Sequence, residues 1–208
     1  MPQHIKIVDF GMGNLHSVVR KFDRIGGRAT ASLTSDPADI VRADKLVLPG
    51  VGHFGRAMEN LRSLQMIDAL NEAALVRKIP ILGICLGMQL MTRRSEEGGV
   101  AGFGWIDADV VRLRVKDTLR YKVPHVGWCR VAIRRESALL KEIPDGAEFY
   151  FVHSYTLRVN EADVVLCESD YARSFPSAIE DGNLFGVQFH PEKSHRLGDR
   201  LLENFVEL

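Results

Sequence analysis

Residues 79–89 read Ile79-Pro80-Ile81-Leu82-Gly83-Ile84-Cys85-Leu86-Gly87-Met88-Gln89. The apolar run at 79–82 predicts a buried strand, and the spacing of residues 88, 90 and 91 predicts a helix directly after it. Cys85 stands between them in a Gly-x-Cys-x-Gly turn, the thiol form of a nucleophile elbow. A Cβ at either flanking position would clash in so sharp a turn, so both glycines fit it. We therefore expect the thiol at the carboxyl end of a strand and at a helix N-terminus, where the dipole favours thiolate. On this stretch alone, a buried structural cysteine is the alternative.

Strand and helix patterns alternate through the first half of the chain. Strands are predicted at 4–10, 30–33 and 44–48; helices are predicted from Leu15 to a stop at Gly26-Gly27, after a cap at 35–37, and over 56–77 with a break near Ser63. This order predicts a parallel sheet with helices on both faces, with ligands beyond the carboxyl ends of its strands. The turn at 11–14, Gly-Met-Gly-Asn, lacks the third glycine of a dinucleotide fingerprint and is interpreted as a tight turn.

After Glu97-Gly98-Gly99 the pattern becomes β-rich. Short strands are predicted at 105–113, 122–128, 149–159, 164–168, 177–179 and 184–189, and apolar residues at 197, 201, 202, 205 and 206 predict a closing helix. We expect one α/β domain over residues 1–208: three layers around a mostly parallel sheet, followed by a β-rich C-terminal half.

Composition excludes several classes of protein. Lys plus Arg equals Asp plus Glu at 27 each, which argues against nucleic-acid binding through bulk charge. No apolar run reaches membrane-spanning length, and the first residues lack the pattern of a signal peptide, so neither a membrane segment nor a leader is expected. Three widely spaced cysteines without a Cys-x-x-Cys pair disfavour a disulfide framework and a zinc site, and fit a reducing cytoplasm.

His190 is the candidate base for the thiol. It directly follows the predicted strand at 184–189, and Glu192 stands two residues further on. In an extended segment, side chains at i and i+2 point the same way, so the carboxylate is expected to orient the imidazole. A loop histidine beside an unrelated glutamate is the alternative.

Together, Gly-Ile-Cys-Leu-Gly-Met-Gln and Gln-Phe-His-Pro-Glu resemble the class I (triad) glutamine amidotransferases, which hydrolyse glutamine to glutamate and ammonia. The resemblance covers nearly the whole chain and includes the motifs at 9–15, 48–55, 124–128, 150–155 and 188–194. These are similar to the branch of the family that serves histidine biosynthesis. The resemblance implies a flavodoxin-like three-layer fold and neither a cofactor nor a metal.

The resemblance also implies roles for individual residues. Cys85 is the nucleophile, His190 the base and Glu192 its orienting carboxylate. The oxyanion hole is formed at Val51, Gly52 and Leu86, and the amino-acid end of glutamine is held by Gln89, Glu97, Ser154 and Tyr155.

In that branch, the glutaminase subunit docks on a (β/α)8 cyclase, which uses the ammonia to make imidazole glycerol phosphate and aminoimidazole carboxamide ribotide. Trp128, Tyr150 and Lys193 match its interface positions. Cys129 replaces the asparagine usual after Pro-His-Val-Gly-Trp, and residues 104–106 and 193–196 also resemble a paralogous branch that supplies ammonia for amidination of bacterial surface sugars. A catalytically silent module and a cysteine peptidase are further alternatives.

Overall fold

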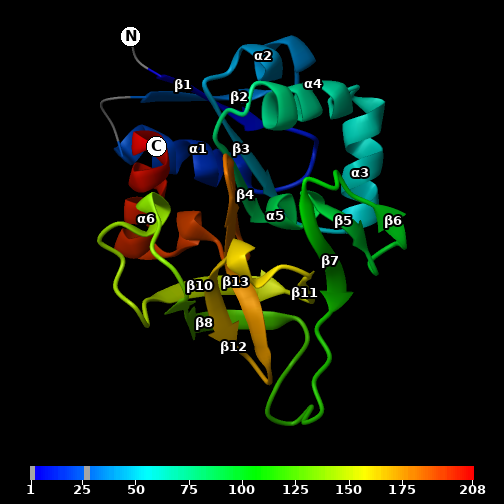
Figure 1. The fold of residues 1–208 in the computed structure, drawn as a ribbon, viewed down its shortest axis with the longest axis vertical. Coiled ribbons are helices and arrows are strands. Elements are labelled where there is room, and N and C mark those ends of the chain that lie inside the picture. The colour runs from blue at the N-terminus through cyan, green and yellow to red at the C-terminus, as the bar shows by residue number, and fades with distance from the viewer. Residues whose placement is uncertain (1–2, 26–28) are drawn as a thin grey trace.

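The computed structural model describes residues 3–25 and 29–208 (Figure 1). The predicted helix stop at Gly26-Gly27 lies outside the described residues. In the first half, the elements are β1 (Gln3–Val8), α1 (Leu15–Ile25), β2 (Ala29–Thr34), α2 (Pro37–Arg42), β3 (Lys45–Gly50), α3 (Phe54–Ser63), α4 (Ile67–Asn71), a π-helical turn (Glu72–Val76), β4 (Ile81–Cys85) and α5 (Leu86–Leu90). Asp36 caps α2 through the amide of Ala38, and the predicted break at Ser63 is where α3 ends.

The second half is β-rich, as expected. It contains β5 (Thr92–Ser95), β6 (Val100–Ala101), β7 (Ile106–Arg112), β8 (His125–Arg130), β9 (Ala132–Ile133), β10 (Glu148–His153), β11 (Tyr155–Val159), β12 (Val165–Asp170), β13 (Ser174–Asp181), β14 (Leu184–Val187) and α6 (His195–Glu207). Three short 3₁₀ turns lie among them in the described chain, and the last, η4 (Pro191–Lys193), follows β14.

The main sheet brings the two halves together. Among the described strands its order is β2-β1-β3-β4-β14-β13-β12-β9, parallel from β2 to β14 and antiparallel beyond. Strand β14 pairs with β4 in parallel, Val187 opposite Ile84. Because parallel strands end at the same edge, the residues that follow β14 come to the same edge of the sheet as Cys85.

Helices cover both faces of this sheet, as predicted. Along β3, Leu46 and Leu48 belong to the apolar cluster beneath α2–α5, whereas Val47 belongs to the cluster beneath α1 and α6. Figure 1 shows α1 and α6 together on one side and α3 and α4 on the other. The alternation of side chains along each strand thus supplies both cores, and the three-layer α/β arrangement is confirmed.

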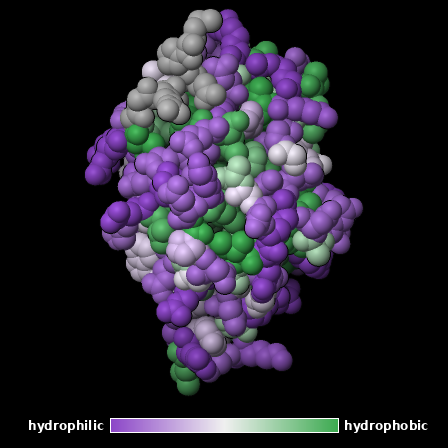
Figure 2. Space-filling model, turned by 60° about the vertical axis from the view of Figure 1, so that its left-hand side comes forward, coloured by the Kyte–Doolittle hydropathy of each residue, from purple (hydrophilic) through white to green (hydrophobic). Residues whose placement is uncertain are grey.

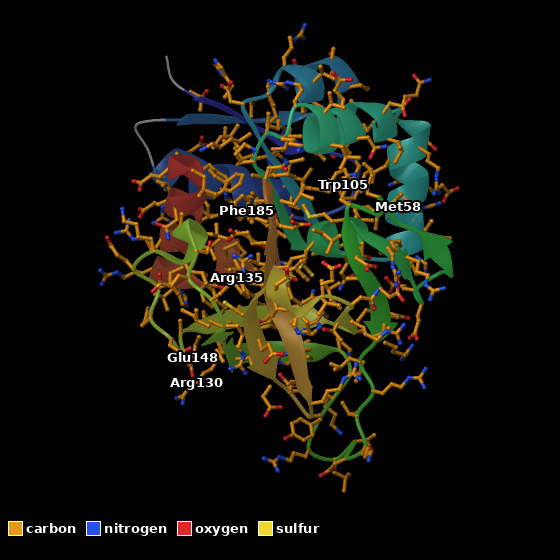
Figure 3. All side chains as sticks on the ribbon, viewed as in Figure 1. Met58, Trp105, Arg130, Arg135, Glu148 and Phe185 are labelled. Atoms are coloured by element: carbon orange, nitrogen blue, oxygen red, sulfur yellow. The ribbon has the colours of Figure 1, made fainter. Side chains whose placement is uncertain are left out.

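Two smaller sheets, β10-β8 and β11-β7-β5-β6, complete the fold. In Figure 3, Arg130 of β8 and Glu148 of β10 lie side by side, and their side chains form an ion pair. The same figure places Phe185 of β14 near α6, whose Phe205 it meets edge to face. On the face shown in Figure 2, hydrophilic side chains predominate around a central apolar strip. Among the described residues, no helix is long and apolar enough to cross a membrane.

One prediction about these elements is wrong, and strand β5 was not predicted. The segment 149–159, predicted as one strand, is interrupted at Ser154, and its halves β10 and β11 join different sheets. The helix predicted after Cys85 is present as α5 and ends at Leu90, and Thr92–Ser95 form the unpredicted strand β5, which pairs with β6 and β7. Pairing with other strands decided both cases, and the periodicity within one segment does not carry that information.

Close packing around the elbow requires its glycines. A Cβ on Gly83 would lie 2.6 Å from the Met88 nitrogen, and a Cβ on Gly87 would lie 2.6 Å from the carbonyl carbon of Leu48 and nearer still to its oxygen. Strand β3, strand β4 and helix α5 therefore meet with backbone against backbone.

We predict that Gly87→Ala destabilises the protein by more than about 3 kcal/mol, or prevents folding, although alanine in a helix is ordinarily favoured over glycine by about 1 kcal/mol. Thermal or urea unfolding measures the effect. Gly182→Ala is the matched control: Gly182 has a φ of +58° and open space around the Cβ position, so a loss of about 1–2 kcal/mol is expected there. Equal losses in the two variants would show that backbone overlap is not the constraint.

Candidate active site

Cys85 lies at the turn between β4 and α5 in a strained conformation. Its φ of 54° and ψ of −108° lie outside the regions that non-glycine residues favour. Only 6% of the residue is exposed, and it lines a cavity of about 200 Å³ at the carboxyl edge of the sheet. The elbow predicted from the sequence is therefore present. Helix α5 has only five residues, so its dipole contributes less to the thiolate than the sequence implied.

The cavity brings together residues from several distant segments. It is lined by Val51, Gly52, Cys85, Leu86, Gln89, Glu97, Pro124, Val152, His153, Ser154 and Tyr155. Every residue predicted for the oxyanion hole or for the amino-acid end of the substrate is among them. They come from the loop after β3, the start of α5, the loop after β5 and the junction of β10 and β11.

His190 and Glu192 do not line the cavity but are buried next to Cys85. The Nδ1 atom of His190 lies 2.8 Å from Oε1 of Glu192, and the two residues are 2% and 9% exposed. The predicted pairing is present, but the expected reason for it is wrong. His190 is extended, whereas Glu192 lies in the 3₁₀ turn η4, and this turn rather than a continued strand swings the carboxylate to the imidazole.

The groups around His190 favour its charged, imidazolium form. Burial alone would lower the pKa of His190, but interactions with the Cys85 sulfur and the Glu192 carboxylate outweigh it and raise that pKa well above its usual value. The Nε2 atom is buried and has no hydrogen-bond partner among the described residues. At neutral pH the site therefore holds an imidazolium next to a sulfur that can carry negative charge.

The backbone of β10 fixes the position of His190. The His190 amide donates to the Tyr150 carbonyl at 2.8 Å, and the Ser194 hydroxyl donates to the His190 carbonyl at 2.6 Å. That hydroxyl also accepts from the Tyr150 amide at 3.1 Å. Residue 150 is thus bonded on both backbone groups to the segment that carries the imidazole.

The residues predicted to hold substrate are themselves held. Gln89 donates one Nε2 hydrogen to the Tyr155 carbonyl at 3.1 Å and the other to Gln188 at 3.0 Å, so its carbonyl oxygen is what remains for a ligand. Glu97 accepts from the Phe54 amide at 2.8 Å through Oε2. Gly52, with a φ of +117°, gives the loop at Val51 a turn that other residues would resist.

Sequence reasoning missed two polar residues of the site, His153 and Gln188. His153 lines the cavity, and its Nε2 lies 3.1 Å from Nδ1 of His125; burial lowers the pKa of each histidine to about 4, so both are neutral. Gln188 is fully buried, with its Nε2 3.6 Å from the Cys85 sulfur. Both stand within quoted motifs, but nothing in their spacing indicates these contacts.

The predicted interface residues form a separate surface cluster, in which Trp128 and Lys193 are exposed and Tyr150 is half-buried. The rings of Trp128 and Tyr150 are 5.9 Å apart, and the Lys193 ammonium lies 5.8 Å from the Tyr150 ring centre. Trp128 is 46% exposed and stacks on His195. Cys129, beside it, is half-buried, with its sulfur 3.5 Å from the Asp170 carbonyl oxygen.

Comparison of the sequence with known families gives one match over almost the whole chain: the family described as "Glutamine amidotransferase class-I" matches residues 6–208. A Pseudomonas aeruginosa protein named "Imidazole glycerol phosphate synthase subunit HisH 2" is 44% identical, covering 98% of this chain and 99% of its own. "Imidazole glycerol phosphate synthase subunit HisH" of Moorella thermoacetica is 48% identical, covering 98% and 94%.

Solved structures show the same fold at low sequence identity. A putative GMP synthase subunit from Thermoplasma acidophilum superposes with a TM-score of 0.70 at 22% identity, covering all of this chain and 94% of its own. The glutaminase domain of Trypanosoma brucei CTPS, solved with bound acivicin, gives 0.69 at 20% identity, covering 99% and 91%.

We predict that iodoacetamide alkylates Cys85 before the other two cysteines. Burial raises the pKa of the Cys129 thiol, and raises that of Cys167 to about 12, so both remain protonated at neutral pH. Cys85 instead lines an open cavity beside an imidazolium. Peptide mass spectrometry after brief treatment at pH 7 gives the order of labelling. Modification of Cys129 first would contradict the assignment of the reactive thiol.

Proposed function

The chain belongs to the class I glutamine amidotransferases, and from that premise we propose that it is the glutaminase subunit of an imidazole glycerol phosphate synthase in histidine biosynthesis. It hydrolyses glutamine to glutamate and ammonia, and the ammonia passes to a (β/α)8 cyclase subunit. Relatives 44% and 48% identical over nearly their full lengths carry that subunit name. The match over residues 6–208 supports treating the chain as one glutamine amidotransferase domain.

The observation that carries the proposal is the assembly of Cys85, His190 and Glu192 beside the cavity. The Cys85 thiolate attacks the carboxamide carbon of glutamine, and a C–S bond forms while the carbonyl electrons move to oxygen. His190 then gives its proton to the departing nitrogen. Ammonia departs, and the acyl group remains bound to Cys85 as a thioester. Water, deprotonated by His190, cleaves the thioester to glutamate and restores the thiol pair. No cofactor or metal takes part.

Backbone amides stabilise the oxyanion in this proposal. Leu86, the residue after the nucleophile, begins α5, and its amide is one donor; Val51 is the other. Gly50, which shares the peptide plane of the Val51 amide, and Gly52, with its φ of +117°, absorb the dihedral changes that turn this amide towards the substrate. Gln89, Glu97, Ser154 and Tyr155 hold the amino-acid end at the cavity wall.

The surface cluster of Trp128, Tyr150 and Lys193 is the proposed docking surface for the cyclase. It is joined to the catalytic histidine by the paired backbone bonds of Tyr150, so a partner that shifts β10 also shifts His190. Delivery through a dry interior keeps ammonia unprotonated and nucleophilic. All three cysteines lie in the described chain as free thiols, which supports a cytoplasmic location.

The alternative is a paralogous glutaminase that supplies ammonia for amidination of bacterial surface sugars. Cys129, in place of the usual asparagine, is next to Trp128 of the proposed docking surface. A different partner would require different side chains at this surface. Relatives named subunit HisH 1 and HisH 2 occur among those at 43–44% identity. The hydrolysis would be the same, and only the partner would differ.

We predict that Glu192→Gln moves the alkaline limb of the kcat/KM profile to lower pH. The Glu192 carboxylate favours the imidazolium, so its replacement by an amide lowers the pKa of His190. The variant therefore loses activity at a lower pH than the wild type does. His190→Ala removes the proton donor itself and should reduce kcat by about 10²–10⁴. Glutamine turnover measured from pH 6 to 10 tests both. An unmoved alkaline limb in Glu192→Gln, or full activity in His190→Ala, would contradict the triad.

We predict that Cys85→Ala abolishes glutamine-dependent synthesis by the complex but leaves synthesis from added ammonium intact.

The wild-type chain alone should turn over glutamine slowly, and the cyclase with its nucleotide substrate should raise the rate by about 10²–10³, the effect of gaining one oxyanion donor. Assays of the chain alone, with the cyclase and with the cyclase plus that substrate measure this. Stimulation by a surface-sugar synthase, but not by the cyclase, would assign the protein to the alternative branch.

A further inference from the structure

We propose that Gln188 is a further catalytic residue, whose side-chain amide donates an N–H hydrogen bond to the Cys85 thiolate and favours it over the thiol. Its Nε2 lies 3.6 Å from the sulfur, within the range of a hydrogen bond to sulfur, and the residue is fully buried. The contact itself does not depend on the proposed function, but its consequence for glutamine turnover does. Gln188 does not line the cavity, so it acts on the nucleophile and not on the substrate.

The orientation of the Gln188 amide follows from a backbone group. The Tyr155 carbonyl can only accept, and it accepts from Gln89 Nε2 at 3.1 Å. The second hydrogen on Gln89 Nε2 is therefore directed to the Oε1 atom of Gln188, 3.0 Å away. With its oxygen so engaged, Gln188 must present its NH₂ group to the sulfur. Rotating either amide by 180° would set donors against donors or acceptors against acceptors.

A second contact at the sulfur opposes the first. The Val152 carbonyl oxygen lies 3.7 Å from Sγ of Cys85, where it accepts the S–H of the thiol and repels a thiolate. Gln188 is the amide donor that counteracts this carbonyl. In a buried site of low dielectric such a hydrogen bond to charge is stronger than in water. Gln188 and the imidazolium of His190 thus both favour the charged sulfur.

Gln188 stabilises charge at an earlier stage of the reaction than the oxyanion hole does. As the C–S bond forms, negative charge leaves sulfur for the carboxamide oxygen, so the Gln188 hydrogen bond weakens during the attack. Its main effect is therefore on how much thiolate is present at a given pH. Loss of the amide should move the acid limb of Cys85 reactivity, in contrast to Glu192, which acts on the alkaline limb.

The test measures alkylation of Cys85 by iodoacetamide against pH, with the labelled peptide quantified by mass spectrometry. Gln188→Met keeps the length of the side chain but removes the donor, and the acid limb should rise by about 1 pH unit, as expected for loss of one hydrogen bond to a charged group. Gln188→Glu keeps the acceptor for Gln89 and places an oxygen against the sulfur, so it should shift the limb at least as far. It also serves if the methionine variant does not fold.

Ser177→Ala is the matched control. Ser177 is equally buried, its backbone carbonyl accepts from the Gln188 amide at 2.9 Å, and its hydroxyl has no hydrogen-bond partner among the described residues. Its removal should leave the acid limb in place. An unmoved limb in the folded Gln188 variants, or an equal shift in Ser177→Ala, would overturn the proposal.

Turnover provides the second readout and separates this inference from the proposed function. The acid limb of kcat/KM for glutamine should move with the alkylation profile, while KM changes little in Gln188→Glu, because this variant keeps the acceptor for Gln89 and residue 188 does not line the cavity. If the wild-type chain with its cyclase hydrolysed no glutamine, the proposed function would fail while the alkylation shift still tested Gln188. A raised KM with an unmoved acid limb would instead make Gln188 a substrate-positioning residue and refute its role on the thiolate.

Discussion

The approach of helix α5 to strand β3, backbone against backbone, is the constraint on which the site depends. Gly87 has no Cβ, so it can lie over the Leu48 carbonyl, and Gly83 similarly admits the turn at Met88. Only with both contacts can the chain reverse sharply enough to hold Cys85 at a φ of 54° at the edge of the sheet. The strain at that residue is offset by the packing of the two apolar clusters around it. The sulfur is therefore placed by rigid elements and not by a loop, which suits the proposed role of Cys85 as a nucleophile that must meet its substrate at a fixed distance.

Around that sulfur, buried polar groups are arranged so that charge is favourable. Glu192 orients His190, and the imidazolium lies beside the thiol. On another side, a chain of amides leads from the Tyr155 carbonyl through Gln89 to Gln188 and ends at the sulfur. Along this amide chain each donor meets an acceptor, which is what a buried polar network requires if it is to specify one arrangement. The neutral pair His125 and His153 adds no charge to this environment.

The β-rich half connects this chemistry to the surface. Strand β10 carries Tyr150 outward beside Trp128 and is bonded through its backbone to the segment of His190. The chain bends at Ser154 to enter β11, and the bend itself lines the cavity with Ser154 and Tyr155. One continuous segment therefore reaches from the surface cluster to the cavity wall. The proposed docking of a partner on this cluster would act on the same rigid unit that positions His190.

Local patterns in the sequence predict the alternation of strands and helices up to β4, the elbow at Cys85 and the candidate pair His190 and Glu192, because apolar periodicity and glycine placement are local properties of the chain. They do not predict that residues 149–159 divide between two sheets, or that Thr92–Ser95 form a strand, because both outcomes depend on which other strands these segments pair with. They predict that Glu192 lies beside His190, but the expected extended geometry is wrong, since the 3₁₀ turn η4 brings the two side chains together. Only the tertiary structure placed Gln188 at the sulfur: it takes the parallel pairing of β14 with β4 and the amide chain from β11 to bring these buried groups within hydrogen-bond distance of one another.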